Sequence, residues 1–284
     1  MKKGLTISMI FEAQSANYGE GVGNITTLKR LTRAGGHSYS YISRQALRYN
    51  IVQQLGWDTT PLEAGSGDKK VIQFHPEATI ESNPEIDLFG YMKTIQGKGA
   101  ETRSAVARLS NAVSMENFSS DIDFLTNMGL SKRLGGDNSI AQSEIHRSFY
   151  TYTVTVDLDR VGIDTDIEID DSEKASRVKS LLSTIEFLYR DIKGRRENLS
   201  PVFMVGGMYS RKTPFFEGRL RLDAKMRLNV DMIATTINSI DEHCMVGYIG
   251  GCFANDNEIE EKLNPVTTKE VFEKLRREVE AVYL

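Results

Sequence analysis

The densest cluster of chemically active side chains lies between Gly21 and Asn50. This stretch contains no acidic residue, and five basic residues are interleaved with three tyrosines and His37. Guanidinium and ammonium groups bind phosphates, and tyrosine rings offer faces on which bases can stack. The combination indicates an RNA-binding surface; the alternative is a solvated surface without a ligand. The basic residues are Lys29, Arg30, Arg33, Arg44 and Arg48, and the tyrosines are Tyr39, Tyr41 and Tyr49.

Charge is also segregated along the rest of the chain. The 284 residues include 35 basic and 39 acidic ones, for a net charge of −4. Residues 157–173 hold eight acids and one base, whereas residues 195–227 hold eight bases and three acids. Separated fields of this kind suit a protein that binds a polyanion on one side. They equally suit head-to-tail self-association, in which an acidic face meets a basic one.

Catalytic, metal-binding and cofactor-binding patterns are weak. His37 lies among basic and hydroxyl groups, but acid–base cleavage of RNA would need a second group, and only Glu12 and Glu20 lie near it in sequence. The run GEGVGN at 19–24 lacks the lysine of a phosphate loop and the spacing of a dinucleotide fingerprint. We therefore expect no cofactor and no metal, and keep a ribonuclease as the alternative function.

Cysteine content and hydropathy bear on location. The two cysteines, Cys244 and Cys252, lack the spacing of a zinc site and are too few for a disulfide framework. A reducing cytoplasm is therefore the expected location. No run of 18 or more apolar residues is present, so we expect no contact with a membrane.

The basic block must be positioned by secondary structure, and periodicity predicts an α+β chain. A helix over 41–55 places Arg44 and Arg48 on one face, after a loop over 15–40. Thr267 and Glu270 form a capping-box pattern that starts a C-terminal helix. The other expected elements are strands over 5–13, 147–158, 200–208 and 245–253, a helix over 173–193, and a half-exposed ribbon over 217–230.

The order of these elements is strand, helix, insertion, strand, helix, strand, strand. A βαββαβ order is that of a ferredoxin-like or RNA-recognition sheet. Residues 57–146 are too many for a loop, so we interpret them as an inserted subdomain. The turn YSRKTPFF carries Arg211, Lys212, Phe215 and Phe216. Its phenylalanines either pack back on the core or form an exposed apolar tip that needs a partner.

Four segments in order carry a family resemblance. They are GLTISMIFEAQSANYGEGVGNITTLKR, YSYISRQALRYNI, ETRSAVARLSNAVS and EIHRSFYTYTVTVDLDRVG, and the tract SPVFMVGGMYS follows them. Together they resemble the CRISPR-associated Cascade backbone subunits of the DevR-like, type I-B group. The resemblance is specific over about the first 160 residues of the chain, where all four segments lie.

The resemblance implies a fold shaped like a right hand. It implies a modified RNA-recognition palm over 1–56 and 147–284, an inserted helical finger over 57–146 and a β-hairpin thumb over 208–227. It also implies a non-catalytic role: copies stack head to tail along the spacer of a CRISPR RNA and present it for pairing with target DNA. The implied partners are further copies, other Cascade subunits and, indirectly, a helicase-nuclease. A DNA-binding autoregulator is a third option, for which no helix-turn-helix pattern is present.

The resemblance also assigns site residues by position. Ser43, Gln45 and Arg48 match the first-helix motif that faces the RNA backbone, and Arg44 lies beside it. Phe215 and Phe216 lie where a thumb tip is expected, and we expect them to wedge between bases. The remaining expected contacts are Lys29, Arg30 and Arg33 in the preceding loop, Arg103 and Arg108 in the finger motif, and Arg211 and Lys212 in the thumb.

Overall fold

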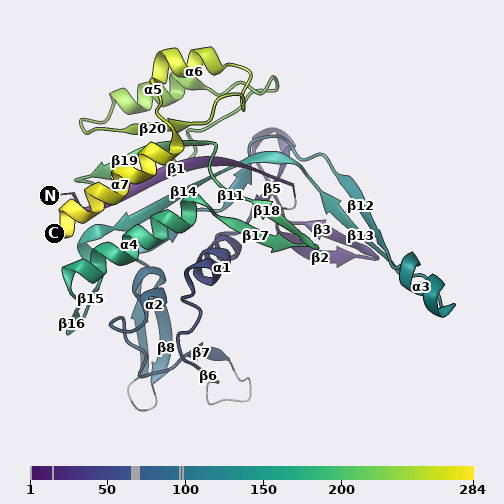
Figure 1. The fold of residues 1–284 in the computed structure, drawn as a ribbon, viewed down its shortest axis with the longest axis horizontal. Helices are drawn as coiled ribbons and strands as arrows, with labels where there is room; N and C mark the ends of the chain where they lie inside the picture. Colours follow the sequence, from purple (N-terminus) through teal and green to yellow (C-terminus); the bar gives the residue numbers. More distant parts are fainter. Residues whose placement is uncertain (1, 15, 65–70, 96, 98) are drawn as a thin grey trace.

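The first strand, β1 (Gly4–Ala13), lies inside the palm sheet and pairs with a neighbour on both sides (Figure 1). The computed structural model describes residues 2–14, 16–64, 71–95, 97 and 99–284. The order of strands in the palm sheet is β20-β19-β1-β14-β11-β5-β4, and β10 also pairs with β14. The other strands are β4 (Arg30–Thr32), β5 (Ser38–Ile42), β10 (Ala107–Leu109), β11 (Ala112–Ser114), β14 (Ser148–Asp157), β19 (Phe203–Tyr209) and β20 (Met245–Tyr248).

The strand order is that of an RNA-recognition sheet. The chain runs β1, α1 (Arg44–Leu55), β10 and β11, β14, α4 (Asp171–Glu186), β19. In space, β1 lies between β14 and β19. β10 and β11 both pair with β14 on the side away from β1, and every one of these pairings is antiparallel. This is the βαββαβ arrangement of ferredoxin-like folds, in which the fourth, first, third and second strands are neighbours. The α+β class predicted from the sequence is confirmed.

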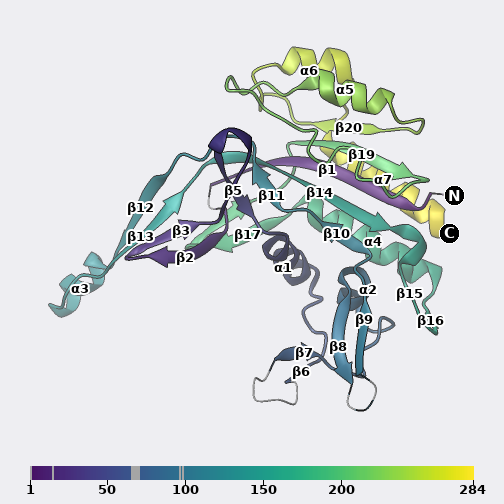
Figure 2. The ribbon, with the colours of Figure 1, turned by 180° about the vertical axis from the view of Figure 1, so that it is seen from behind.

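Helices cover both faces of the palm sheet because the strands alternate their side chains between two cores. Leu5, Ile7 and Met9 face α1, α4 and α7 (Thr268–Tyr283), where Leu181 lies in the same core cluster. Ile10 belongs to a second cluster that also includes residues of α5 (Val230–Asn238) and α6 (Asp256–Leu263). Figure 2 shows α5 and α6 on one side of the sheet and α1 and α4 on the other. None of the helices in the described ranges is long and apolar enough to cross a membrane.

Helix ends follow local sequence signals. Ser43 caps α1 by accepting a hydrogen bond from the Ala46 backbone N–H, and Gly56 ends the helix in a left-handed conformation. The predicted capping box of Thr267 and Glu270 is present at the start of α7. The helix expected over 173–193 ends at Glu186 instead, because the following residues form a hairpin of β17 (Tyr189–Ile192) and β18 (Arg195–Asn198).

A finger-like unit between residues 57 and 106 projects from the side of the palm sheet that α1 and α4 cover (Figure 1). It contains the short helix α2 (Pro84–Phe89) and a small core cluster of Ala78, Ile80 and Ile86. Its strands form two hairpins: β6 (Leu62–Ala64) with β7 (Ile72–Phe74), and β8 (Tyr91–Ile95) with β9 (Gly99–Arg103). The expected insertion over 57–146 is therefore divided, since β10 and β11 within that range belong to the palm sheet.

A second projection, which we call the arm, extends from the other end of the molecule (Figure 1). Its four-stranded sheet has the order β12-β13-β3-β2, and a helix, α3 (Met128–Leu134), lies at its tip. The expectation of a loop over 15–40 is wrong, because that range supplies two strands of the arm and two of the palm. The arm strands are β2 (Tyr18–Val22), β3 (Ile25–Leu28), β12 (Asp121–Thr126) and β13 (Ile140–Ile145).

The ribbon expected over 217–230 is wrong, and so is a paired hairpin over 208–227. β19 ends at Tyr209, and the next segment consists of turns with a single bridge between Leu222 and Leu228. This segment folds against the second core cluster, which includes Phe216, Leu220 and Leu228. The remaining short elements are η1 (Ala34–Gly36), η2 (Leu158–Arg160), β15 (Ile163–Asp164) and β16 (Ile167–Glu168).

Candidate nucleic-acid interface

Four of the basic and polar residues predicted from the sequence line one surface hollow of about 370 Å³, which we call the groove. It lies where the start of α1 faces α2 and β10. The lining combines positive or polar groups with apolar ones, a combination that suits a phosphate backbone with stacked bases. The groove residues are Arg44, Gln45, Arg48 and Arg108, together with Phe89, Ala105, Ala107 and Leu109.

Arg48 is held at the wall of the groove by two residues of α2. Its guanidinium lies 3.2 Å from Glu85 Oε1 and 5.1 Å from the centre of the Phe89 ring. The side chain stays 35% exposed, so part of the guanidinium faces solvent. Such an arginine can exchange a carboxylate for a phosphate, because the planar group binds either acceptor with parallel hydrogen bonds.

Arg44 and Gln45 occupy the first turn of α1, and both are exposed. The Arg44 backbone N–H donates to Asn111 Oδ1 at 2.9 Å, which ties the start of the helix to the loop between β10 and β11. The N-terminal end of a helix carries a partial positive charge, so this end of α1 adds to the attraction for anions. Ser43 is occupied differently: it caps the helix and donates to Asn17 Oδ1 at 2.7 Å.

Asp157 joins two predicted contact residues from distant parts of the chain. It lies 3.1 Å from Arg108 and 3.7 Å from Lys212, and its side chain is only 8% exposed. Lys212 also pairs with Asp159 at 2.5 Å. The carboxylate therefore orients Arg108 at the groove and brings Lys212 beside it. Arg211, the neighbour of Lys212, is exposed.

Lys29, Arg30 and Arg33 lie near the outer edge of the palm sheet, on or beside β4, and do not line the groove. The guanidinium of Arg30 lies 4.6 Å from the centre of the Phe118 ring and 3.7 Å from Glu144. The guanidinium of Arg33 lies 5.1 Å from the centre of the Tyr39 ring. These pairs present positive charge on aromatic faces, which is a second surface suited to nucleic acid.

Three of the expected contact residues are buried or packed against the core. Arg103 has a side chain only 2% exposed and paired with buried Asp87 at 2.6 Å. Phe216 is 1% exposed in the second core cluster, and Phe215 is half-buried against Tyr209 with ring centres 5.0 Å apart. The structure supports the alternative in which the phenylalanines pack on the core, and the expectation that they form an exposed apolar tip is wrong.

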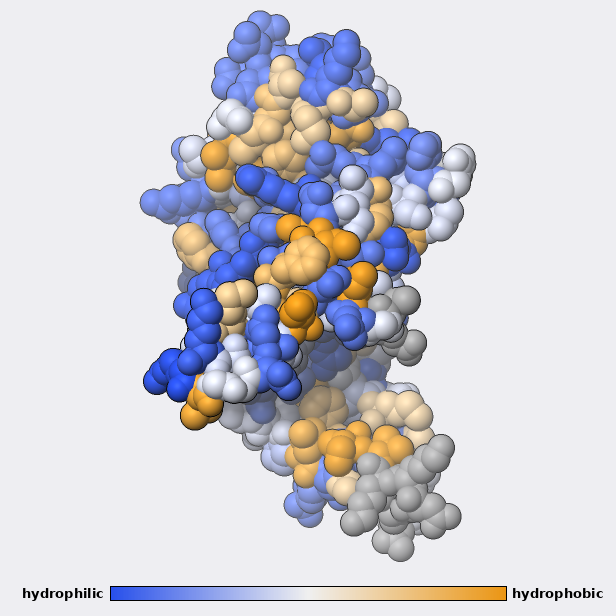
Figure 3. Space-filling model, turned by 90° about the vertical axis from the view of Figure 1, so that its right-hand side faces the viewer, coloured by the Kyte–Doolittle hydropathy of each residue, from blue (hydrophilic) through white to orange (hydrophobic). Residues whose placement is uncertain are grey.

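Exposed apolar side chains gather on the arm instead. Figure 3, which faces the arm, shows them at its tip in the middle of the view and again below, over β6 and β7. The tip helix also carries Lys132 and Arg133 in its last turn. The most exposed apolar residues of the arm are Phe124, Leu125, Leu130, Leu134 and Ile140, each more than half exposed.

The groove residues on α2 could not be predicted from the sequence. Phe89 and Glu85 meet Arg48 only because the finger folds back against α1. One local signal could have located the helix: the segment NPEIDLF has proline at the first helical position and acidic residues in its first turn. In the sequence, Asp157 is distinguished only as the first residue of the acidic stretch 157–173.

Comparison with known proteins identifies the family of this chain. The model of one family, described as CRISPR-associated negative auto-regulator DevR/Csa2, matches residues 5–226. The chain belongs to this CRISPR-associated DevR/Csa2 family, as the resemblance of its sequence segments indicated. No individually curated protein sequence matches it.

Two solved structures share the fold. A chain of a "CRISPR RNA-guided surveillance complex, pre-nicking" is 10% identical with a TM-score of 0.65, over 97% of this chain and 100% of that one. A chain of a "CRISPR RNA-guided surveillance complex" is 15% identical with a TM-score of 0.54, over 86% of this chain and 87% of that one. At these identities the likeness shows the fold alone.

Proposed function

We propose that this chain is a non-catalytic CRISPR RNA-binding backbone subunit of a type I-B Cascade surveillance complex. Copies lie head to tail along the spacer of the guide, hold its backbone and leave its bases available to pair with target DNA. Family membership and the shared fold support the class. The observation that carries RNA binding is the groove, which gathers Arg44, Gln45, Arg48 and Arg108 at the start of α1.

The groove has the composition expected for backbone binding without sequence readout. Its basic groups come from α1 and β10, and Phe89 and Leu109 supply apolar surface between them. Phosphate contacts of this kind give affinity that falls as salt is raised, because bound counterions are released. The free thiols of Cys244 and Cys252 agree with a reducing cytoplasm as its location.

The arm is the element we assign to contacts between copies. Its apolar side chains are too exposed for an isolated chain in water, and a surface of this kind needs a partner. The tip bears Lys132 and Arg133, whereas the acidic hairpin of β15 and β16 lies at the other end of the molecule (Figure 1). A head-to-tail arrangement brings a basic, apolar end toward an acidic one.

The first experiment is purification of the chain after co-expression with a CRISPR array and the other Cascade subunits. We expect a large particle that contains a discrete, nuclease-resistant RNA. The double variant Arg44→Ala/Arg48→Ala should retain less RNA and show a shallower loss of affinity between about 50 and 200 mM salt. Lys269→Ala, at an exposed position on α7, is the matched control. Unchanged retention and salt dependence in the double variant would reject the groove as the RNA site.

The alternative is a ribonuclease on the same fold, which would use His37 or Glu20. His37 is exposed next to the edge strands of the palm sheet. Incubation of the purified chain with labelled repeat RNA and target RNA, with and without magnesium, separates the two functions. Cleavage that His37→Ala abolishes would replace the proposal with the ribonuclease, whereas intact RNA in all incubations supports it.

A further inference from the structure

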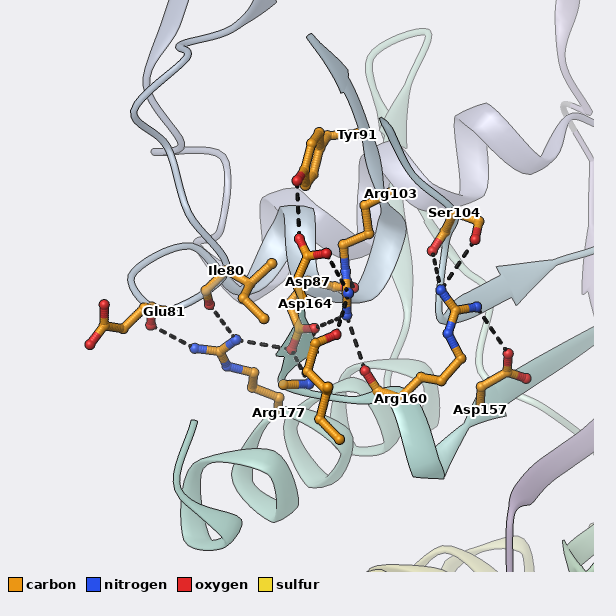
Figure 4. A network of polar contacts seen from close by, with 12 residues as sticks. Ile80, Glu81, Asp87, Tyr91, Arg103, Ser104, Asp157, Arg160, Asp164 and Arg177 are labelled. Carbon is orange, nitrogen blue, oxygen red and sulfur yellow. Dashed lines mark hydrogen bonds and ion pairs between the residues drawn. The ribbon is translucent and has the colours of Figure 1, made fainter. Parts of the chain in front are cut away.

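Asp87 is a fully buried carboxylate at the junction of the finger and the palm (Figure 4). Its two oxygens accept hydrogen bonds from Arg103 at 2.6 Å, from Arg177 at 2.9 Å and from the Gly162 backbone N–H at 3.0 and 3.1 Å. The donors come from β9, from α4 and from the loop after η2. One carboxylate on α2 thus binds three segments that are distant in sequence.

The two arginines extend this junction through backbone carbonyls. Arg103 donates to the carbonyls of Asp87, Arg160 and Ile163. Arg177 donates to the carbonyls of Ile80 and Glu81 at 2.7 and 2.9 Å. A buried arginine is stable only when its donors are satisfied, and here the finger and the palm satisfy them together.

Two glycines allow the close approach. A Cβ atom at Gly90, which joins α2 to β8 at a φ of +73°, would collide with the backbone of Arg103 and Ala105. A Cβ atom at Gly162, at a φ of +70°, would collide with the side chains of Ile169 and Lys174. Gly90 therefore lets the end of α2 lie against the end of β9, and Gly162 lets the loop after η2 pack against the start of α4.

The opposite side of α2 holds the groove. Glu85 and Phe89, one helical turn apart, fix the guanidinium of Arg48, and Asp87 lies between them in sequence. α2 has only six residues, so it cannot shift at one face without shifting at the other. The placement of α2 depends on Asp87, because this carboxylate pairs with the buried guanidinium groups of both Arg103 and Arg177 and offsets their positive charges.

We propose that Asp87 is a positioning residue for RNA binding, which sets the place of Arg48 in the groove by locking α2 between β9 and α4. This inference rests on the proposed RNA-binding function. It also gives Arg103 a role in place of the direct RNA contact expected from the sequence. Removing the charge of Asp87, or replacing the planar guanidinium of Arg177, frees α2 to move, and Glu85 and Phe89 move with it.

The test is a double-mutant cycle in the full chain, with a fluorescein-labelled single-stranded RNA as the probe. Arg48→Ala should weaken binding about tenfold and lower the salt slope by about 1. Asp87→Asn and Arg177→Lys should each weaken binding about fivefold in the native background, and less than about twofold in the Arg48→Ala background. Glu186→Gln is the control, because it removes a buried carboxylate that pairs with Arg276 away from the groove. It should lower the melting temperature without changing affinity.

The outcomes are distinguishable. Equal losses in the two backgrounds would show that Asp87 acts independently of Arg48 and would overturn the positioning role while leaving the proposed function intact. No effect of Arg48→Ala would reject the groove itself. Arg177→Lys keeps the charge and is the milder change; if it and Asp87→Asn both fail to fold, the junction is a general stability element and the positioning role is rejected.

Discussion

Tyr150 and Tyr152 lie two residues apart on β14, and both rings contact Phe11, yet their hydroxyl groups differ in hydrogen bonding. The Tyr150 hydroxyl is bonded to the Ser40 hydroxyl at 2.7 Å and donates to the His146 carbonyl at 3.1 Å. Among the described residues, the buried Tyr152 hydroxyl has no hydrogen-bond partner. Burial raises the pKa of both hydroxyls, so both stay protonated even at a pH where an exposed tyrosine would ionise.

The pair gives a prediction with its own control. Tyr152→Phe should raise the free energy of unfolding by up to about 1 kcal/mol, because it removes a buried polar group without a partner. Tyr150→Phe should lower it by about 1 kcal/mol, because it leaves Ser40 and the His146 carbonyl short of a partner. Urea unfolding at neutral pH measures both. A loss of stability in Tyr152→Phe would reveal a hydrogen bond to that hydroxyl which the described residues do not provide.

Individual residue roles were predictable only where they depend on local sequence. The capping box at Thr267 and the shared face of Arg44 and Arg48 follow from the spacing of these residues in the sequence. Arg103 shows the limit. It has the same charge as Arg48 and lies in an expected motif, but its guanidinium is buried against Asp87. Burial of that kind depends on how the finger meets the palm, and periodicity carries no information on it.

At the scale of elements, the long strands and helices of the palm were predictable because apolar periodicity marks them. The arm was not, because β2, β3 and β12 are short and mostly half-exposed or exposed, and β3 pairs with β13 across more than 100 residues of sequence. The segment after β19 has an alternating pattern of charged and apolar residues, which predicts a strand. Its apolar residues instead face the second core cluster from a series of turns.

A substitution at Phe216 tests whether the segment after β19 packs in the second core cluster or acts as a thumb. Phe216→Ala should lower the free energy of unfolding by about 3–5 kcal/mol, because it leaves a cavity in the second core cluster. Phe187→Ala is the matched control, since that ring is 68% exposed and its loss should cost little. Chemical denaturation measures the difference. Unchanged stability of Phe216→Ala with weakened RNA binding would restore the wedge expected from the sequence.

At the scale of the whole molecule, net charge says less than where the charges lie. A chain with a net charge of −4 still presents a basic groove, because acidic residues gather elsewhere, for example on the β15–β16 hairpin. The sequence indicated this segregation and the palm topology. It could not indicate the apolar tip of the arm, which we propose meets the next copy, since that tip is assembled from segments distant in sequence.

The arm gives the prediction at this scale. The triple variant Leu125→Ser/Leu130→Ser/Leu134→Ser should leave a folded chain that no longer forms long assemblies on RNA, because it removes the exposed apolar surface of the tip. Size-exclusion chromatography with light scattering measures the particles. Ile249→Ser/Val266→Ser changes exposed apolar residues elsewhere and should assemble normally. Assemblies of native size in the triple variant would assign the contact between copies to another surface.

The exposed tip of the arm has a consequence for the supply of this protein in the cell. A chain made in excess of its partners displays an apolar helix on a long projection, which chaperones and proteases recognise as unfinished folding. Unassembled copies should therefore have short half-lives, and turnover would match the number of copies to the guide RNA available. Synthesis of the chain and of its RNA need then not be balanced at the level of transcription.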